Sequence, residues 1–280
     1  MNATVSNFYY GAATPVAAYL LACLGAALGL RCTTRSLRRR HRRAGWLALG
    51  ATSIGCGIWT MHFIAMIGFN IQGALVDYDT TKTLLSLAVA IGVVAVGLFL
   101  VGYRGASPLT LATAGAVTGL GVAAMHYLGM AAMHTNGTLH YDTPTVTLSV
   151  VIAVIAATAA LWAAVSIHTL WASIGASMIM GVAVTGMHYT GMASVSVHLT
   201  GRSAVSQSSA DLLSFLLAML AGPLVALLIS AVVVMFDPDM VLGDAQWERT
   251  AAPSSRKDGL DAPTRQRALH DGRPSTPAEW

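Results

Sequence analysis

Long, nearly uncharged apolar stretches dominate the chain, and short polar segments separate them. A bilayer core about 30 Å thick needs about 20 helical residues to cross it. Seven stretches reach that length, namely residues 10–30, 44–69, 83–102, 108–133, 145–167, 170–196 and 211–235. Backbone polar groups in hydrocarbon must be satisfied within their own segment. The pattern therefore predicts an all-α, polytopic membrane protein with seven transmembrane helices.

The composition agrees with this prediction. Of 280 residues, 55% are hydrophobic and 10% are charged, whereas soluble domains carry about 25% charged residues. The net charge of +4 does not indicate nucleic-acid binding, because the basic residues are concentrated beside the apolar stretches. We expect a multi-pass protein of the plasma membrane, surrounded by lipid bilayer and without a nucleic-acid partner.

Basic residues also predict the orientation. With the amino terminus outside, the inner face receives 14 Lys and Arg residues, from segment 31–43, Arg104 and the segment after Gly243, while the outer face receives Lys82 and Arg202. Cytoplasmic loops carry the excess of Lys and Arg. The sequence thus predicts the amino terminus outside and the carboxyl terminus inside. We expect residues 1–236 to form the membrane domain and residues 237–280, rich in Pro, Ser, Arg, Asp and Ala, to form a disordered cytoplasmic tail.

A six-residue pattern, Met-His-aromatic-x-(Ala/Gly)-Met, occurs three times within the even-numbered spans. The copies are Met61–Met66, Met125–Met130 and Met187–Met192. Their histidines, His62, His126 and His188, lie 64 and then 62 positions apart, and each is 18 residues into its predicted span. The even-numbered spans share one direction, so the copies share one membrane depth near the outer face. The chain therefore reads as repeats of a helix pair.

The pattern places soft metal ligands on one side of each helix. A histidine and the methionine four positions later lie about 40° apart on adjacent turns. Imidazole with thioether is a ligand set that favours copper, especially Cu(I). The candidate metal ligands are Met61, His62, Met66, Met125, His126, Met130, Met187, His188 and Met192. The alternative is that methionine fills packing gaps and histidine hydrogen-bonds across helices, which explains one copy better than three at equal depth.

Other polar residues receive simpler interpretations. Asp79 and Asp142 follow the first two motif histidines at similar distances, and we expect them to cap the next helix. His134, eight residues after His126, is expected to be a solvated loop residue. Tyr127 and Tyr189 are candidates for hydrogen bonds to a ligand of the site.

The triple pattern resembles the MHYT family of bacterial integral membrane sensor domains. The third copy spells the tetrapeptide literally, whereas the first has Phe63 and Ile64 and the second has Leu128. The resemblance covers about residues 8–236. It implies a copper-binding sensor for dioxygen, carbon monoxide or nitric oxide, with the motif Met and His residues as ligands. The family often carries diguanylate cyclase or phosphodiesterase domains, and we expect none in residues 237–280.

These features together favour a non-enzymatic sensor that signals through a separate cytoplasmic partner. Two other functions remain open at this point: copper uptake or transport, and haem binding by imidazoles from facing helices. Ligands clustered at the outer end argue against transport, and we regard haem as the weaker cofactor. Redox catalysis lacks support, because Asp77, Asp79 and Asp142 all lie in predicted loops.

Overall fold

The computed structural model of the protein describes residues 5–6, 9–38, 40–71, 76–135, 137–167, 169–199 and 209–236. Seven helices in this part of the chain are long and apolar enough to cross a membrane. They are α1 (Ala13–Arg38), α2 (Arg43–Ile67), α3 (Thr80–Arg104), α4 (Pro108–Ala132), α5 (Thr143–Ser166), α6 (Leu170–Ala193) and α7 (Ser209–Met235). The predicted all-α fold with seven membrane helices is confirmed. The predicted tail, 237–280, lies outside the described residues.

One predicted loop is wrong. Segment 31–43 is mostly helical, because α1 continues to Arg38 and a 3₁₀ turn, η1 (Arg40–Arg42), leads directly into α2. Arginine is a good helix former, so the helix extends beyond its apolar stretch. Hydrophobicity marks where hydrocarbon ends, and a helix is free to continue past that point.

The odd-numbered helices α3 and α5 begin at the predicted caps. The Asp79 carboxylate accepts a hydrogen bond from the Lys82 backbone N–H at 3.0 Å, and Asp142 accepts one from the Thr145 N–H at 3.1 Å. Each bond satisfies one of the N–H groups that a first helical turn leaves unpaired. The two equivalent caps confirm that the segments 79–104 and 142–166 correspond.

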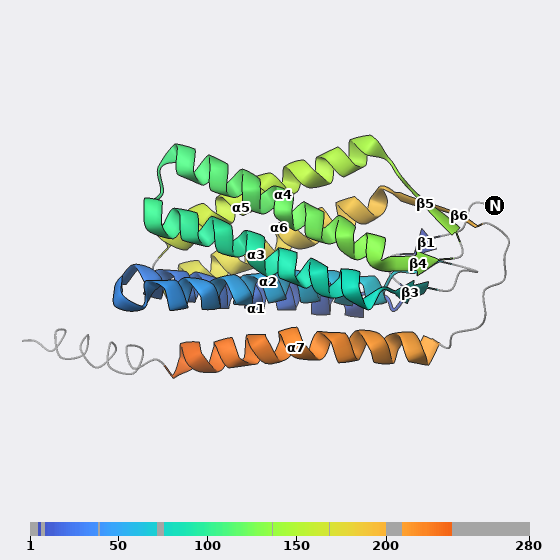
Figure 1. Ribbon diagram of the computed structural model, residues 1–280, viewed down its shortest axis with the longest axis horizontal. Coiled ribbons are helices and arrows are strands. Elements are labelled where there is room, and N and C mark those ends of the chain that lie inside the picture. Colours follow the sequence, from blue (N-terminus) through green and yellow to red (C-terminus); the bar gives the residue numbers. More distant parts are fainter. Residues whose placement is uncertain are drawn as a thin grey trace, which may run out of the picture. The chain divides into compact units, whose positions relative to one another are not determined.

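Short strands, which the apolar pattern did not predict, lie at one end of the helices (Figure 1). They are β1 (Val5–Ser6), β2 (Asn70–Ile71), β3 (Val76–Tyr78), β4 (Met133–Thr135), β5 (Gly137–Tyr141) and β6 (Val195–Leu199). They form three antiparallel pairs, β1–β2, β3–β4 and β5–β6. Each pair joins the start of an odd-numbered helix to the end of the next even-numbered one. The repeat is therefore strand–helix–helix–strand, three times.

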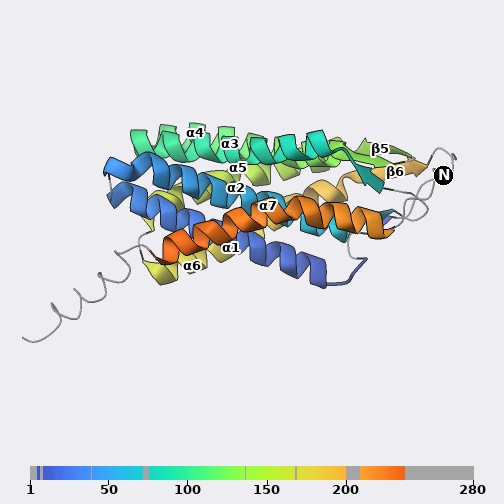
Figure 2. The ribbon, with the colours of Figure 1, turned by 60° about the horizontal axis from the view of Figure 1, so that its bottom comes forward.

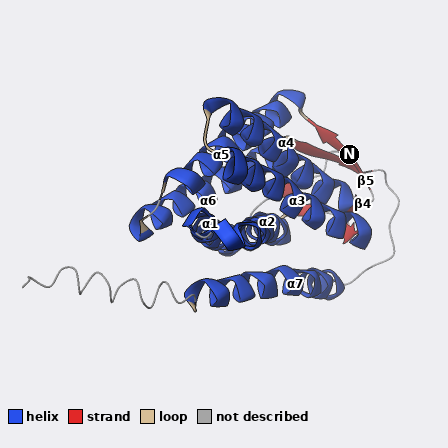
Figure 3. Cartoon of the chain, turned by 60° about the vertical axis from the view of Figure 1, so that its left-hand side comes forward, coloured by secondary structure: helices blue, strands red, loops and turns tan. Residues whose placement is uncertain are grey.

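The three repeats close into a ring of six helices. Each helix from α1 to α6 packs against its neighbours in sequence, and α6 packs against α1. Helix α7 packs against α1 and α2 on the outside of this ring, as Figures 2 and 3 show. Helix α2 has the most buried apolar stretch of the seven, with 72% of its residues inside. The first motif histidine thus comes from the helix that is covered on most sides.

Candidate metal centre

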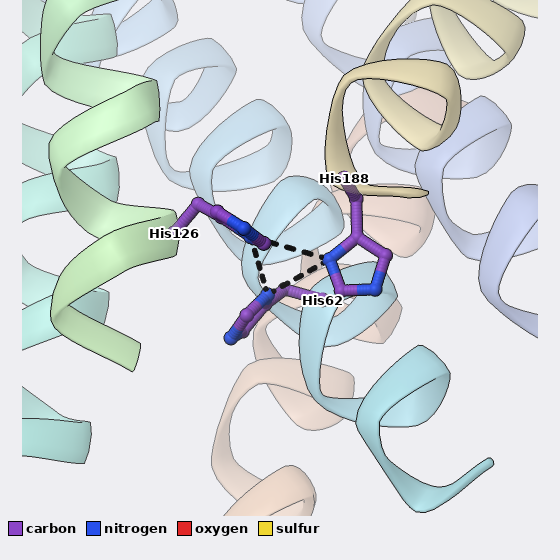
Figure 4. A group of neighbouring side chains, drawn as sticks. All are labelled: His62, His126 and His188. Atoms are coloured by element: carbon purple, nitrogen blue, oxygen red, sulfur yellow. Dashed lines mark hydrogen bonds between the residues drawn. The ribbon is translucent and has the colours of Figure 1, made fainter. Parts of the chain in front are cut away.

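The three motif histidines meet in the interior of the ring (Figure 4). His62 comes from α2, His126 from α4 and His188 from α6, and each is 1% exposed. Their Nδ1 atoms form a triangle with sides of 3.1 Å between His62 and His188, 3.2 Å between His126 and His62, and 3.3 Å between His188 and His126. We call these three residues the histidine triad. The structure thus brings together three side chains that are 126 positions apart at most.

Hydrogen bonds among the imidazoles alone do not satisfy this triangle. In a neutral imidazole, Nδ1 is either a donor or an acceptor. Three atoms with two possible roles cannot alternate around a triangle, so at least one of the three contacts joins two donors or two acceptors. A single cation removes the conflict, because all three nitrogens then direct a lone pair at the same point.

The donor set fits a metal ion. The three ligand atoms lie within 4.8 Å of one another, and the three residues are fully buried. Imidazole nitrogens bind metals such as zinc at about 2.0–2.1 Å, so nitrogens only 3.1–3.3 Å apart are within reach of one ion. Neutral imidazoles also suit copper and iron. The geometry supports a metal site, and it does not distinguish copper from the other imidazole-binding metals.

The far edges of two imidazoles lie against glycine. A Cβ added at Gly129 would be 2.4 Å from Nε2 of His62, and one added at Gly191 would be 2.5 Å from Nε2 of His126. Both Nε2 atoms are buried without a hydrogen-bond partner. The small residue at this motif position therefore does more than bring helices close: it makes the space that the imidazole of the preceding repeat occupies.

The six motif methionines are all buried, at 0–2% exposed, on the same helices as the triad: Met61, Met66, Met125, Met130, Met187 and Met192. Their surroundings differ. Met61 belongs to a small cluster with Ala18 and Ala22 of α1, whereas the other five belong to the main core. The role of the thioethers as ligands stays a prediction.

The remaining histidines of the outer segments are exposed, as expected. His134 lies on β4, and His140 and His198 lie on β5 and β6 with their ring centroids 4.9 Å apart. These positions are on strands, not loops. None of the three joins the triad in the described part of the chain.

Comparison with known proteins now identifies the repeat. The MHYT family model, described as a bacterial signalling protein N terminal repeat, matches residues 55–114 and 119–177. These ranges contain the first two motifs. The chain carries an MHYT domain. No solved structure matches it.

Several curated signalling proteins share this MHYT domain. Over 163 residues, the chain is 39% identical to the bifunctional diguanylate cyclase/cyclic di-GMP phosphodiesterase MucR of Pseudomonas aeruginosa, covering 56% of this chain and 24% of that protein. Over 214 residues, it is 32% identical to the cyclic di-GMP phosphodiesterase NbdA of the same species, covering 74% and 27%. An uncharacterized signaling protein of Caulobacter vibrioides is 36% identical over 155 residues, covering 55% and 19%. The chain thus spans about a quarter of the length of these relatives.

Sequence reasoning missed the residues that hold the aromatic positions of the MHYT domain. The indole N–H of Trp59 donates to the Ser86 hydroxyl at 2.9 Å, and the Tyr127 and Ser149 hydroxyls share a hydrogen bond of 2.7 Å. The two serines are equivalent in α3 and α5, seven residues after Asp79 and Asp142, and both are fully buried. This spacing was the available signal. Tyr127 therefore binds a neighbouring helix, not a ligand of the triad.

Proposed function

We propose that this MHYT domain is a membrane sensor whose histidine triad holds copper near the outer face of the membrane. It responds to dioxygen, carbon monoxide or nitric oxide, or to redox state, and signals through a separate cytoplasmic partner. The observation that carries the proposal is the buried triangle of Nδ1 atoms, 3.1–3.3 Å apart. Two relatives are named as enzymes of cyclic di-GMP turnover, which supports a signalling role.

Copper is the metal that we propose because of the residues around the triad. No carboxylate joins the three imidazoles in the described residues, whereas six buried methionines lie within one helical turn of them. Bound copper supplies one-electron redox chemistry and affinity for small diatomic molecules. The protein's own residues hold the three nitrogens in place, exclude bulk water and keep charged groups away.

Transport is the weaker alternative. One and two turns before each histidine, where a transport path would need further ligands, the residues are Ile58, Val122, Val184, Ile54, Thr118 and Met180. Only one of these six offers a soft ligand atom. Haem is weaker still, because Nδ1 atoms 3.1–3.3 Å apart leave no room for a macrocycle between them.

Metal analysis of the purified protein tests the proposal. We expect copper to bind at about one ion per chain and His62→Ala, His126→Ala and His188→Ala each to abolish binding, because three buried imidazoles share the ion. His140→Ala is the matched control, since His140 is exposed and outside the triad. Copper that is absent after reconstitution, or that survives all three substitutions, contradicts the proposal. A Soret band would favour haem instead.

The methionines need a separate test, because the structure leaves their role open. If thioethers bind the ion, Met66→Leu, Met130→Leu and Met192→Leu weaken Cu(I) binding and leave Zn²⁺ binding unchanged. Met178→Leu is the control, since Met178 is 51% exposed on α6. Equal Cu(I) affinity in all four variants would restrict the site to the three histidines.

A further inference from the structure

An apolar cavity lies directly beneath the histidine triad. Its volume is about 50 Å³, and it is lined by residues of α2 to α6. The lining includes Ile58, Val122 and Val184, each four residues before a triad histidine, and Ile54, Thr118 and Met180, each eight residues before one. Residues four apart lie on the same side of a helix, one turn below each other. The cavity thus continues the axis around which the three repeats are arranged.

The lining has almost no polarity. Fourteen of its fifteen residues are apolar, and the exception, Thr118, directs its hydroxyl to the Val93 carbonyl at 3.4 Å. Water needs two to four polar partners in a buried site, and apolar cavities stay dry and take up apolar molecules. One water needs about 10–15 Å³ of such volume, so this cavity has room for a small apolar molecule.

The repeats explain why the space exists. Helix α3 has Val94 and Val101 where α5 has Ala157 and Ala164, 63 positions later in both cases. Ala157 and Ala164 both line the cavity. Two valines are thus replaced by alanines on one side of an otherwise threefold core, and the missing methyl groups leave space beside the axis.

The cavity also approaches the lipid. Its lining residues that are only partly buried all lie on α5 or α6, namely Ala156, Ala160, Met180 and Val184. On the outer surface of the same helices, Ile155 is 64% exposed and Ile179 is 73% exposed. An apolar exterior of this kind faces hydrocarbon in a membrane helix. A small apolar molecule dissolved in the bilayer therefore has a short route between α5 and α6.

We propose that this cavity is a binding site for dioxygen or a diatomic gas of similar size, which enters from the bilayer between α5 and α6. The gas is held one helical turn below the triad, next to Met187, which lines the cavity and precedes His188. Small size and lack of charge select this ligand class, since the lining offers nothing to bind an ion or a polar metabolite. The functional meaning of the site rests on the proposed function, although gas binding itself does not require the metal.

Dioxygen is its own probe, because it is paramagnetic and shortens the relaxation times of nearby methyl groups. In metal-free protein labelled at its Ile and Met methyls in lipid nanodiscs, we expect dioxygen to relax Ile58 and Met187 about as strongly as lipid-facing Ile155. Met130, which is 0% exposed and does not line the cavity, should be affected several-fold less. If Ile58 and Met187 respond as weakly as Met130, no gas enters and the proposal is wrong.

Filling the cavity gives the second arm. Ala157→Leu should remove the effect of dioxygen at Ile58 and Met187, whereas Ala159→Leu, at an exposed position of the same helix, should not. If Ala157→Leu does not fold, Ala157→Val combined with Ala164→Val copies the residues of α3 and should reduce the effect. An unchanged response in a folded, filled variant overturns the proposal.

The outcomes separate the two proposals. A dioxygen effect in the cavity of a protein that binds no copper supports the gas site and contradicts the proposed copper sensor. Copper bound by the triad without a dioxygen effect at Ile58 and Met187 does the reverse.

Discussion

Each of two triad imidazoles rests on the glycine of a neighbouring repeat, and this contact sets the geometry of the metal centre at the scale of single residues. His62 lies against Gly129, and His126 lies against Gly191. Protein interiors are close-packed, so a displaced side chain has little free space nearby. One methyl group at either glycine must therefore move an imidazole or a helix.

Gly191→Ala should weaken metal binding, because its Cβ would lie 2.5 Å from Nε2 of His126. We expect the affinity to fall by about tenfold or more, which corresponds to about 1.4 kcal/mol. Gly186→Ala is the matched control on the same helix, since a Cβ there meets nothing within 4 Å. Metal titration of both variants checks this, and equal affinities would show that the centre tolerates the methyl group.

At the scale of helices, the tightest contact joins α1 to α2. A Cβ on Gly25 would lie 2.7 Å from the Gly57 Cα, and one on Gly57 would lie 2.8 Å from the Gly25 Cα. Small residues let membrane helices approach closely and gain packing contacts where no hydrophobic driving force separates protein from lipid. The backbone atoms cannot rotate away as a side chain can, so larger residues must push the helices apart.

Gly57→Ala should therefore destabilise the protein by about 1–3 kcal/mol, as overpacking of a core does. Gly92→Ala, in the middle of α3, is the control, because a Cβ there meets nothing within 4 Å. Unfolding of both variants in detergent measures the difference. Wild-type stability in Gly57→Ala would mean that the α1–α2 contact is more adaptable than its distances indicate.

The cap of α5 predicts a dependence on pH. Hydrogen bonds from the Thr145 hydroxyl and backbone N–H lower the pKa of Asp142 below its ordinary value. A lowered pKa in the folded state stabilises the protein above the ordinary carboxyl pKa, and this contribution disappears as the pH falls through the folded value.

We expect Asp142→Ala to lower Tm at neutral pH and to differ less from the wild type in acid. Asp142→Asn keeps a capping oxygen without the ionisable group, so its Tm difference from Asp142→Ala should stay constant with pH. Thermal unfolding at several pH values provides the measurement, and a pH-independent loss in Asp142→Ala would contradict the role of the charge.

At the scale of the whole domain, strands and arginines lie at opposite ends of the helices. The strand pairs follow the even-numbered helices, whereas η1 and the end of α1 carry the arginines of segment 31–43. Within the described part, Asp77, Asp79 and Asp142 are all at the strand end. With the predicted orientation, the strands and the triad lie toward the outside and the arginines toward the cytoplasm.

Labelling of single cysteines tests this orientation. In a background without native cysteines, a membrane-impermeant maleimide should label His140→Cys in intact cells and His41→Cys only after lysis, because these exposed residues lie on β5 and η1. The reverse pattern would invert the topology. It would also place the triad on the cytoplasmic side.

The sequence by itself determined the seven spans, the helix-pair repeat and the common depth of the three motifs. These properties follow from local patterns: apolar length, periodicity and equal spacing along the chain. The caps at Asp79 and Asp142 were also local, since a side chain there reaches an N–H three residues on. Position along a helix was therefore predictable, residue by residue.

Only the tertiary structure decided which atoms meet. That Nδ1 and not Nε2 points inward, that glycines 129 and 191 hold the imidazoles, and that a cavity continues the axis all depend on how α1 closes the ring against α6. Closure is set by side-chain packing among residues up to 160 or so positions apart, with α1 and α6 at the two ends of the ring. A periodic pattern states which side of a helix is buried, and it carries no information on the partner that this side will meet.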